Sequence, residues 1–198
     1  MRRYIVALTG ASGVIYGIKL VQELLVRDFE VHLVASQPAC EVIKQELGWE
    51  FEDSLESTFY RYLPGNMCFY RNSDIAANIA SGSFITEGMI VIPCTMSTIS
   101  AIAHGTSKNL IERAADVMLK EKRRLIVVPR EMPLSSIHLR NMLSLAEMGV
   151  HVVPAMPGFY NRPRSIDDMI AFVVGKVMDI MRIPHDLFQR YESSDIEK

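Results

Sequence analysis

The sequence predicts a doubly wound α/β fold of the Rossmann-like or flavodoxin-like kind, with a mostly parallel sheet, helices on both faces and a single domain. Short β-branched apolar runs alternate along the chain with segments of helical spacing, which favours parallel strands joined by right-handed helical crossovers. A glycine-rich turn directly follows the first apolar run. The length of 198 residues, 49% of them hydrophobic, suffices for one domain with a complete core.

The first part of the chain shows the β-turn-α-β pattern most clearly. Residues 4–8 form an uninterrupted β-branched apolar run, as expected for a strand covered on both faces. A helix is expected over residues 15–26, because apolar side chains recur there at helical spacing: Ile15, Ile18, Leu20, Val21, Leu24 and Leu25. Residues 31–35 repeat the strand pattern and residues 39–47 the helical one. Residues 49–73 mix aromatic side chains with a Pro64-Gly65 turn, so we expect an irregular excursion there.

The alternation resumes in the second half. Strands are expected at 89–94, 125–129 and 150–154, and helices at 110–120, 137–148 and 166–181. The predicted domain covers residues 1–187, and residues 188–198 form a C-terminal tail. The polar C-terminal stretch carries apolar side chains that could dock on a neighbouring subunit or pack on their own domain: Ile183, Leu187, Phe188 and Tyr191.

Charge and cysteine usage exclude several function classes. The 21 basic and 23 acidic residues are interspersed and leave a net charge of −2, so neither nucleic acid nor an anionic membrane is indicated as a partner. No apolar run approaches the roughly 20 residues that span a bilayer. Three cysteines without metal-ligand spacing, and no secretory leader, predict a cytoplasmic protein. The five histidines are scattered, so we expect no metal site.

Polar loops follow the predicted strands, and in an open parallel sheet such loops converge on one edge. The run Thr9-Gly10-Ala11-Ser12-Gly13 allows close backbone approach, and the following helix dipole suits a phosphate. Because the run is not GxGxxG, a mononucleotide is favoured over a dinucleotide. A glycine-rich turn can also be purely structural.

The other loops carry hydroxyl and charged groups. Ser36 can cap a helix or touch a ligand, and the run Thr95-Met96-Ser97-Thr98 offers three hydroxyls where one cap would suffice. Arg130 and Glu131 are either a surface ion pair or an anion contact beside a proton carrier. Cys94 is more plausible as a packing thiol than as a nucleophile. Tyr160 follows a stiff proline-rich loop that would position it.

Taken together, these loops resemble one family, the UbiX-type flavin prenyltransferases, formerly described as phenylacrylic acid decarboxylases. The resemblance runs from the first strand to about Leu187 and rests on motifs that occur in this order: Thr9-Gly10-Ala11-Ser12-Gly13, Tyr16-Gly17, Ser81-Gly82-Ser83, Pro93-Cys94, 109–116, Lys120-Glu121, Pro129-Arg130-Glu131-Met132-Pro133 and Pro157-Gly158-Phe159-Tyr160.

The resemblance implies an enzyme that joins a dimethylallyl group from dimethylallyl monophosphate to N5 and C6 of reduced FMN. It implies no metal, a homo-oligomer that is commonly a dodecamer, and a UbiD-type decarboxylase as recipient of the prenylated FMN. The FMN contacts that it implies are Gly10, Ala11, Ser12, Ser36, Thr95, Met96, Ser97, Thr98 and Arg130. The prenyl-phosphate contacts that it implies are Lys120, Arg130, Tyr160 and Lys176.

Catalytic roles are implied in the same way. Glu131 would move protons near the leaving phosphate, and Ser12 with Glu46 would manage protons during ring closure. Lys120 begins a basic cluster at 120–124 that otherwise indicates a solvated helix terminus. The position of Lys176 is usually arginine in this family, which affects prenyl-donor preference because lysine lacks the bidentate fork.

Three other functions fit the same residues less fully. One is an FMN-dependent decarboxylase acting directly on an aromatic acid, and another is a decarboxylase of cysteine-like substrates. The third is a non-catalytic carrier that delivers FMN to a partner enzyme. The combination of Arg130 and Glu131 favours the prenyltransferase.

Overall fold

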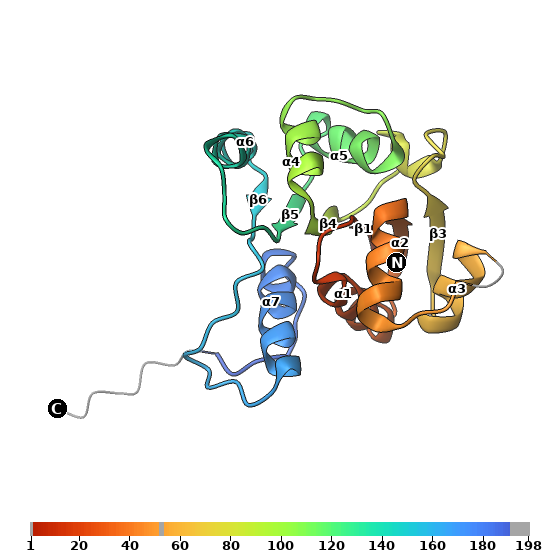
Figure 1. Ribbon diagram of the computed structural model, residues 1–198. Coiled ribbons are helices and arrows are strands. Elements are labelled where there is room, and N and C mark those ends of the chain that lie inside the picture. The colour runs from red at the N-terminus through yellow and green to blue at the C-terminus, as the bar shows by residue number, and fades with distance from the viewer. Residues whose placement is uncertain (1, 52–53, 191–198) are drawn as a thin grey trace.

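One sheet of six parallel strands organises the protein. The structure, a computed structural model, describes residues 2–51 and 54–190. The strands lie in the order β3-β2-β1-β4-β5-β6 (Figure 1), and every pairing between neighbours is parallel. Their bounds are Arg3–Leu8 (β1), Glu30–Ala35 (β2), Met67–Arg71 (β3), Gly88–Cys94 (β4), Leu125–Pro129 (β5) and His151–Val152 (β6). The predicted parallel, doubly wound sheet is confirmed.

Helices cover both faces of this sheet (Figure 1). One face carries α1 (Val14–Val26), α2 (Gln37–Leu47), α3 (Leu55–Tyr62) and α7 (Ile166–Ile180), which share one apolar core. The other carries α4 (Met96–Ala103), α5 (Leu110–Lys120) and α6 (Ser136–Glu147), which share a second core. Strand side chains alternate between the two cores, since Val6 and Leu8 lie in the first and Ile5 and Ala7 in the second.

The strand order decides where a ligand can bind. Strand β1 pairs with β2 on one side and with β4 on the other, so the direction of winding reverses between β1 and β4. Ligands of open α/β sheets bind at such a switch point, beyond the carboxyl ends of the strands. This order is the Rossmann order rather than the flavodoxin order, which settles the choice left by the sequence.

The prediction of an irregular excursion over residues 49–73 is wrong. The structure has helix α3 and strand β3 there, and β3 extends the sheet beside β2. The aromatic side chains that obscured the pattern form a packed cluster, in which the rings of Trp49 and Tyr62 stack with centroids 4.2 Å apart. Strand β3 is only partly buried, so it lacks the continuous apolar run of the central strands.

The C-terminal segment packs on its own domain. Ile183 is buried, and Leu187 and Phe188 contact the core that contains α7. The ring of Phe188 lies 5.0 Å from that of Phe172, and His185 bonds to Asp179 of α7. Tyr191, the fourth apolar residue of this stretch, lies outside the described residues. Among the helices described, none is both long and apolar enough to cross a membrane.

Candidate functional site

Thr9 joins the carboxyl ends of β1 and β4 at the switch point. Its hydroxyl donates to the Pro93 carbonyl at 2.8 Å and accepts from the Thr95 amide at 2.9 Å. The side chain is only 3% exposed, so each of these hydrogen bonds is protected from water. Thr9 therefore holds the glycine-rich loop and the start of α4 in one arrangement.

The glycine-rich loop is shaped by close backbone contacts. A Cβ atom at Gly10 would collide with Pro38 of α2, and one at Gly17 would collide with the Ile92 carbonyl and Leu8. Gly13 has φ of 93°, a left-handed conformation that glycine adopts at little cost. These contacts bring α1 and α2 close to the ends of β1 and β4.

The amides at the start of α1 are occupied by a side chain. The Glu46 carboxylate of α2 accepts from Gly13 N at 3.0 and 3.1 Å and from Val14 N at 3.3 Å. A phosphate cannot use these two amides while Glu46 holds them. Part of the anion site that the sequence placed at this helix start is thus taken by Glu46 of the chain itself, which lies close to Ser12 in space because Ser12 directly precedes Gly13.

The start of α4 remains open. Thr95 caps the helix by accepting from Thr98 N at 3.2 Å, and the two threonine hydroxyls lie 2.9 Å apart. Within the described residues, the amides of Met96 and Ser97 have no hydrogen-bond partner. Unpaired amides at a helix start favour an anion. The predicted Thr95 to Thr98 contacts therefore lie at a chemically suitable place.

Ser36 has the capping role that the sequence left open. Its hydroxyl accepts from Ala39 N at 3.2 Å at the start of α2, and its amide donates to the Leu8 carbonyl. The hydroxyl hydrogen is not used in the cap, so Ser36 can still donate to a ligand. Ser36 is only half-buried and faces the same sheet edge as the glycine-rich loop.

Arg130 and Glu131 follow β5 and reach the same edge. The Arg130 Nε donates to the Ser12 carbonyl at 3.2 Å, across 118 positions of sequence. Burial raises the pKa of the neighbouring Tyr16 hydroxyl, and the Arg130 charge opposes that rise. Glu131 Oε1 accepts from the Met132 amide at 3.0 Å. A pocket of about 210 Å³ adjoins both side chains and is otherwise mainly apolar, with Met132, Leu134, Met142 and Met156 in its lining.

Cys94 is a packing residue. It ends β4, is completely buried in the second core, and burial raises the pKa of its thiol. A thiol in this setting is neither ionised nor accessible.

Lys120 lies at the opposite edge of the sheet. Lys120 is the last residue of α5 and precedes β5, whereas Arg130 follows β5. The two residues are therefore separated by the length of β5, roughly 16 Å along the strand direction. Its ammonium is 3.5 Å from Glu121 Oε1. The Ser81-Gly82-Ser83 motif lies beside it, because Arg123 donates to the Gly82 and Phe84 carbonyls. Within one chain, Lys120 and Arg130 therefore lie at opposite edges of the sheet and cannot contact the same phosphate.

Tyr160 and Lys176 lie on the face opposite to α5. The Tyr160 ring meets that of Phe172 edge-on at 5.6 Å, and Lys176 follows Phe172 by one turn of α7. Both side chains are exposed. Lys176 lies roughly 15 Å along α7 from its start, well away from the switch point. The predicted prenyl-phosphate contacts therefore occupy three separate places on one chain.

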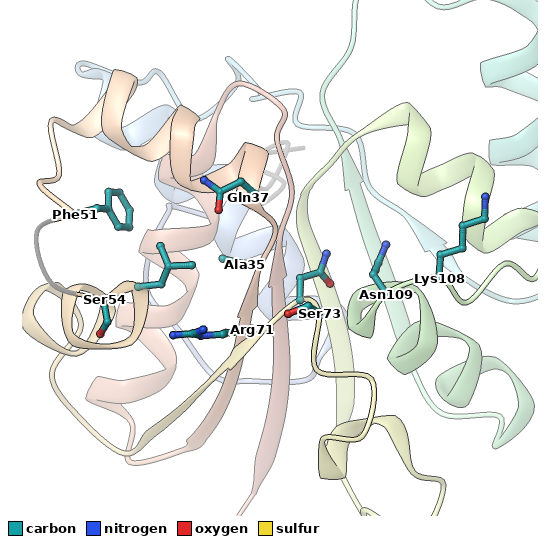
Figure 2. Close-up of a pocket in the computed structure, with 10 residues that line it drawn as sticks. Ala35, Gln37, Phe51, Ser54, Arg71, Ser73, Lys108 and Asn109 are labelled. Carbon is teal, nitrogen blue, oxygen red and sulfur yellow. The ribbon is translucent and has the colours of Figure 1, made fainter.

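A further pocket opens beside Ser36, at the ends of β2 and β3. It measures about 730 Å³, and Ala35 and Gln37 are among its lining residues. Figure 2 shows Arg71 on the β3 side and Lys108 on the α5 side, with side chains that do not point toward one another. Sequence reasoning missed this pocket because it missed β3, which ends at Arg71.

Comparison with known proteins places this geometry in a family. The model of the Flavoprotein family matches residues 1–181. A protein of Halalkalibacterium halodurans named flavin prenyltransferase UbiX is 51% identical over 190 residues, covering 95% of this chain and 92% of its own. The chain belongs to the UbiX flavin prenyltransferase family.

Solved structures of UbiX-type proteins share the whole fold. A dodecameric FMN-dependent UbiX-like decarboxylase from Escherichia coli O157:H7 is 44% identical, covers 96% of this chain and 100% of its own, and superimposes with a TM-score of 0.87. A UbiX protein called AnUbiX (PadA1), in complex with FMN and dimethylallyl pyrophosphate, is 42% identical, with coverage of 98% and 99% and a TM-score of 0.88. The family resemblance expected from the sequence is confirmed.

Proposed function

We propose that this protein is a flavin prenyltransferase that joins a dimethylallyl group from dimethylallyl monophosphate to N5 and C6 of reduced FMN. The observation that carries the proposal is the contact between Arg130 and the Ser12 carbonyl. It places a cation and the adjacent Glu131 beside the glycine-rich loop at the switch point. That combination suits a reaction in which a phosphate leaves next to a bound flavin.

The FMN phosphate binds at the start of α4 in this proposal. Glu46 occupies the amides of α1, whereas those of Met96 and Ser97 are open. The hydroxyls of Ser36, Ser97 and Thr98 add donors, and Gly10, Ala11 and Ser12 line the flavin. In this distribution Thr95 caps α4 and Arg130 serves the donor phosphate, and the other predicted FMN contacts meet the flavin or its phosphate, with Glu46 near Ser12.

Reduced FMN supplies the nucleophilic N5 and C6 atoms. Arg130 and Lys120 neutralise the phosphate as the carbon–oxygen bond of the donor breaks, and Glu131 holds the proton that the departing phosphate needs. The apolar lining near Arg130 keeps water from the allylic carbon. Ser12 and Glu46 then carry the proton exchanged during ring closure. None of these residues needs a metal ion for its role.

Neighbouring copies of the chain complete the prenyl-phosphate site. Lys120, the pair Tyr160 and Lys176, and Arg130 lie in three places on one chain, so one phosphate can meet all four only where copies adjoin. Exposed apolar side chains on and around α6, among them Met132 at 85% and Ile137 at 64% exposure, support such packing. A homo-oligomer, most simply a dodecamer as in the Escherichia coli relative, follows.

We also propose a cytoplasmic location and a UbiD-type decarboxylase as recipient of the prenylated FMN. The described cysteines Cys40, Cys68 and Cys94 are free thiols, which agrees with a reducing compartment.

The test is an anaerobic incubation of the purified protein with reduced FMN and dimethylallyl monophosphate, followed by the mass of the extracted flavin. A gain of one dimethylallyl unit is expected. Unchanged flavin that remains bound would instead indicate an FMN carrier, and carbon dioxide released from an aromatic acid or a cysteine-like substrate would indicate a decarboxylase.

A further inference from the structure

Three potential metal ligands meet on β2 and β3, away from the flavin edge. Glu30 and His32 lie two residues apart on β2, and Cys68 is paired with His32 in the register of β3. One carboxylate oxygen, one imidazole nitrogen and the sulfur all lie within 4.8 Å of one another. The three side chains point to the same face of the sheet, the face that α5 covers.

The hydrogen bonds of His32 leave an acceptor in the centre of this cluster. The Tyr70 hydroxyl donates to Asn78 Oδ1 at 2.8 Å. The same oxygen lies 2.8 Å from His32 Nδ1, and because its hydrogen is already used, it accepts a hydrogen bond from that nitrogen. The proton of a neutral ring therefore sits on Nδ1. Its Nε2 then presents a lone pair to Glu30 Oε1 at 3.0 Å, and two acceptors face each other.

Either a proton on Nε2 or a metal ion between these atoms resolves that opposition, and the nearby Cys68 sulfur adds a third ligand that only a metal ion uses. We propose that Glu30, His32 and Cys68 form a binding site for a zinc ion, with water or another small ligand in the fourth position. Imidazole, thiolate and carboxylate together suit zinc, whereas magnesium and calcium prefer oxygen alone. The thiol proton leaves to solvent as the zinc–sulfur bond forms. The site goes beyond the proposed prenyl transfer and uses none of its residues.

The surroundings match those of known metal-bound histidines. A ligating histidine usually donates its other ring N–H to an oxygen that fixes its orientation, as Tyr70 Oη does here.

The charged neighbours leave one carboxylate oxygen for the metal. Arg3 is the cation that faces the cluster, and its Nε binds Glu30 Oε2 at 2.9 Å while Oε1 turns to His32. Phe84 from the loop before β4 covers the His32 ring edge-on. Glu30 and a Cys68 thiolate offset the two charges of a divalent ion, while Arg3 adds one positive charge at the edge of the cluster.

Only a small movement is needed to close the site. Ligand atoms of tetrahedral zinc lie about 3.4 to 3.7 Å apart, so the His32 and Glu30 atoms, 3.0 Å apart, need to separate by only about 0.4 Å. Cys68 is partly exposed, so its sulfur can approach and the ion can enter from solvent. A bound ion would join the edge strand β3 to β2.

The test uses full-length protein freed of metal by a chelator and titrated with cobalt(II), a spectroscopic substitute for zinc. A thiolate-to-cobalt charge-transfer band that saturates at one equivalent and disappears on adding zinc is expected. Cys68→Ser should abolish the band, His32→Gln should weaken cobalt binding at least tenfold, and the matched control Cys40→Ser should keep it. Tyr70→Phe should retain the band with about 10- to 100-fold weaker affinity.

Zinc should also raise the melting temperature of the unmodified protein and of Cys40→Ser, but not that of Cys68→Ser. Circular dichroism checks that each variant is folded, and Glu30→Gln provides a second variant if Cys68→Ser is not. A cobalt spectrum without a saturable thiolate band, or a band that survives in Cys68→Ser, would overturn the proposal.

Discussion

The Glu46 carboxylate of α2 accepts hydrogen bonds from Gly13 N, at 3.0 and 3.1 Å, and from Val14 N, at the start of α1. It satisfies amides that a helix start otherwise leaves unpaired, and its negative charge lies at the positive end of the helix dipole. This one side chain therefore stabilises the glycine-rich loop and moves the proposed phosphate position to α4.

Glu46→Ala should lower the free energy of unfolding by about 1 kcal/mol, because α1 loses an acceptor equivalent to an N-cap. Urea denaturation measures the change. Glu41→Ala is the matched control, since Glu41 is also exposed on α2 but bonds only to the Gln37 side chain. Equal losses in the two variants would show that the contact with α1 contributes nothing.

Thr9→Val should cost about 2 to 3 kcal/mol of folding free energy. The substitution keeps the shape but leaves the Pro93 carbonyl and the Thr95 amide without the hydroxyl that serves both. Thr58→Val is a suitable comparison, because Thr58 is equally buried at 3% but makes one hydrogen bond, to the Ser54 carbonyl. Thr58→Val should lower the free energy of unfolding by about 1 kcal/mol. A loss in Thr9→Val no larger than the loss in Thr58→Val would contradict the bridging role of Thr9.

Glu131→Gln and Lys120→Met should each leave FMN affinity within about twofold and slow adduct formation about a hundredfold, since each removes a group proposed for the leaving phosphate. Flavin fluorescence titration and flavin mass measure the two effects. Lys122→Asn is the control at the same edge as Lys120, and asparagine tolerates its φ of 51°. Undisturbed turnover in either variant would contradict its assigned role.

Mixing these two slow variants should restore part of the activity. If Lys120 and Glu131 of one site come from different copies, then about a quarter of the sites in randomly mixed oligomers hold both native residues. The measurement is adduct formation after the variants are dissociated together and reassembled, compared with each variant treated alone. No recovery, despite mixed oligomers seen by native mass spectrometry, would show that both residues act from one chain.

Acid should weaken the docking of the C-terminal segment through Asp179. Burial raises the pKa of this carboxyl, but hydrogen bonds from Arg190 and His185 and their charges outweigh it, so the pKa lies below its ordinary value of 3.8. A lowered folded-state pKa contributes stability above about pH 4 that is lost as the pH falls through the folded value. Asp179→Asn should flatten the acid limb of stability against pH. An acid limb in this variant that matches the one of the unmodified protein would contradict the contribution of Asp179.

The fold was largely predictable because the central strands are covered on both faces and must be apolar throughout. Strand β3 was not, since it lies at the sheet edge with partly exposed side chains, and the contacts that stabilise it come from β2 and the Trp49 cluster. Its apolar pattern carries little information without those partners.

The sequence by itself determined the parallel sheet, the polar loops at its carboxyl edge and, through its motifs, the UbiX family. These features are local, because each depends on the spacing of neighbouring residues. Only the tertiary structure decided that Glu46 binds the loop, 33 positions away, that Lys120 faces the opposite edge from Arg130, and that Cys68 meets His32. Such pairings depend on strand register and helix direction, which arise when distant segments bury their apolar faces together.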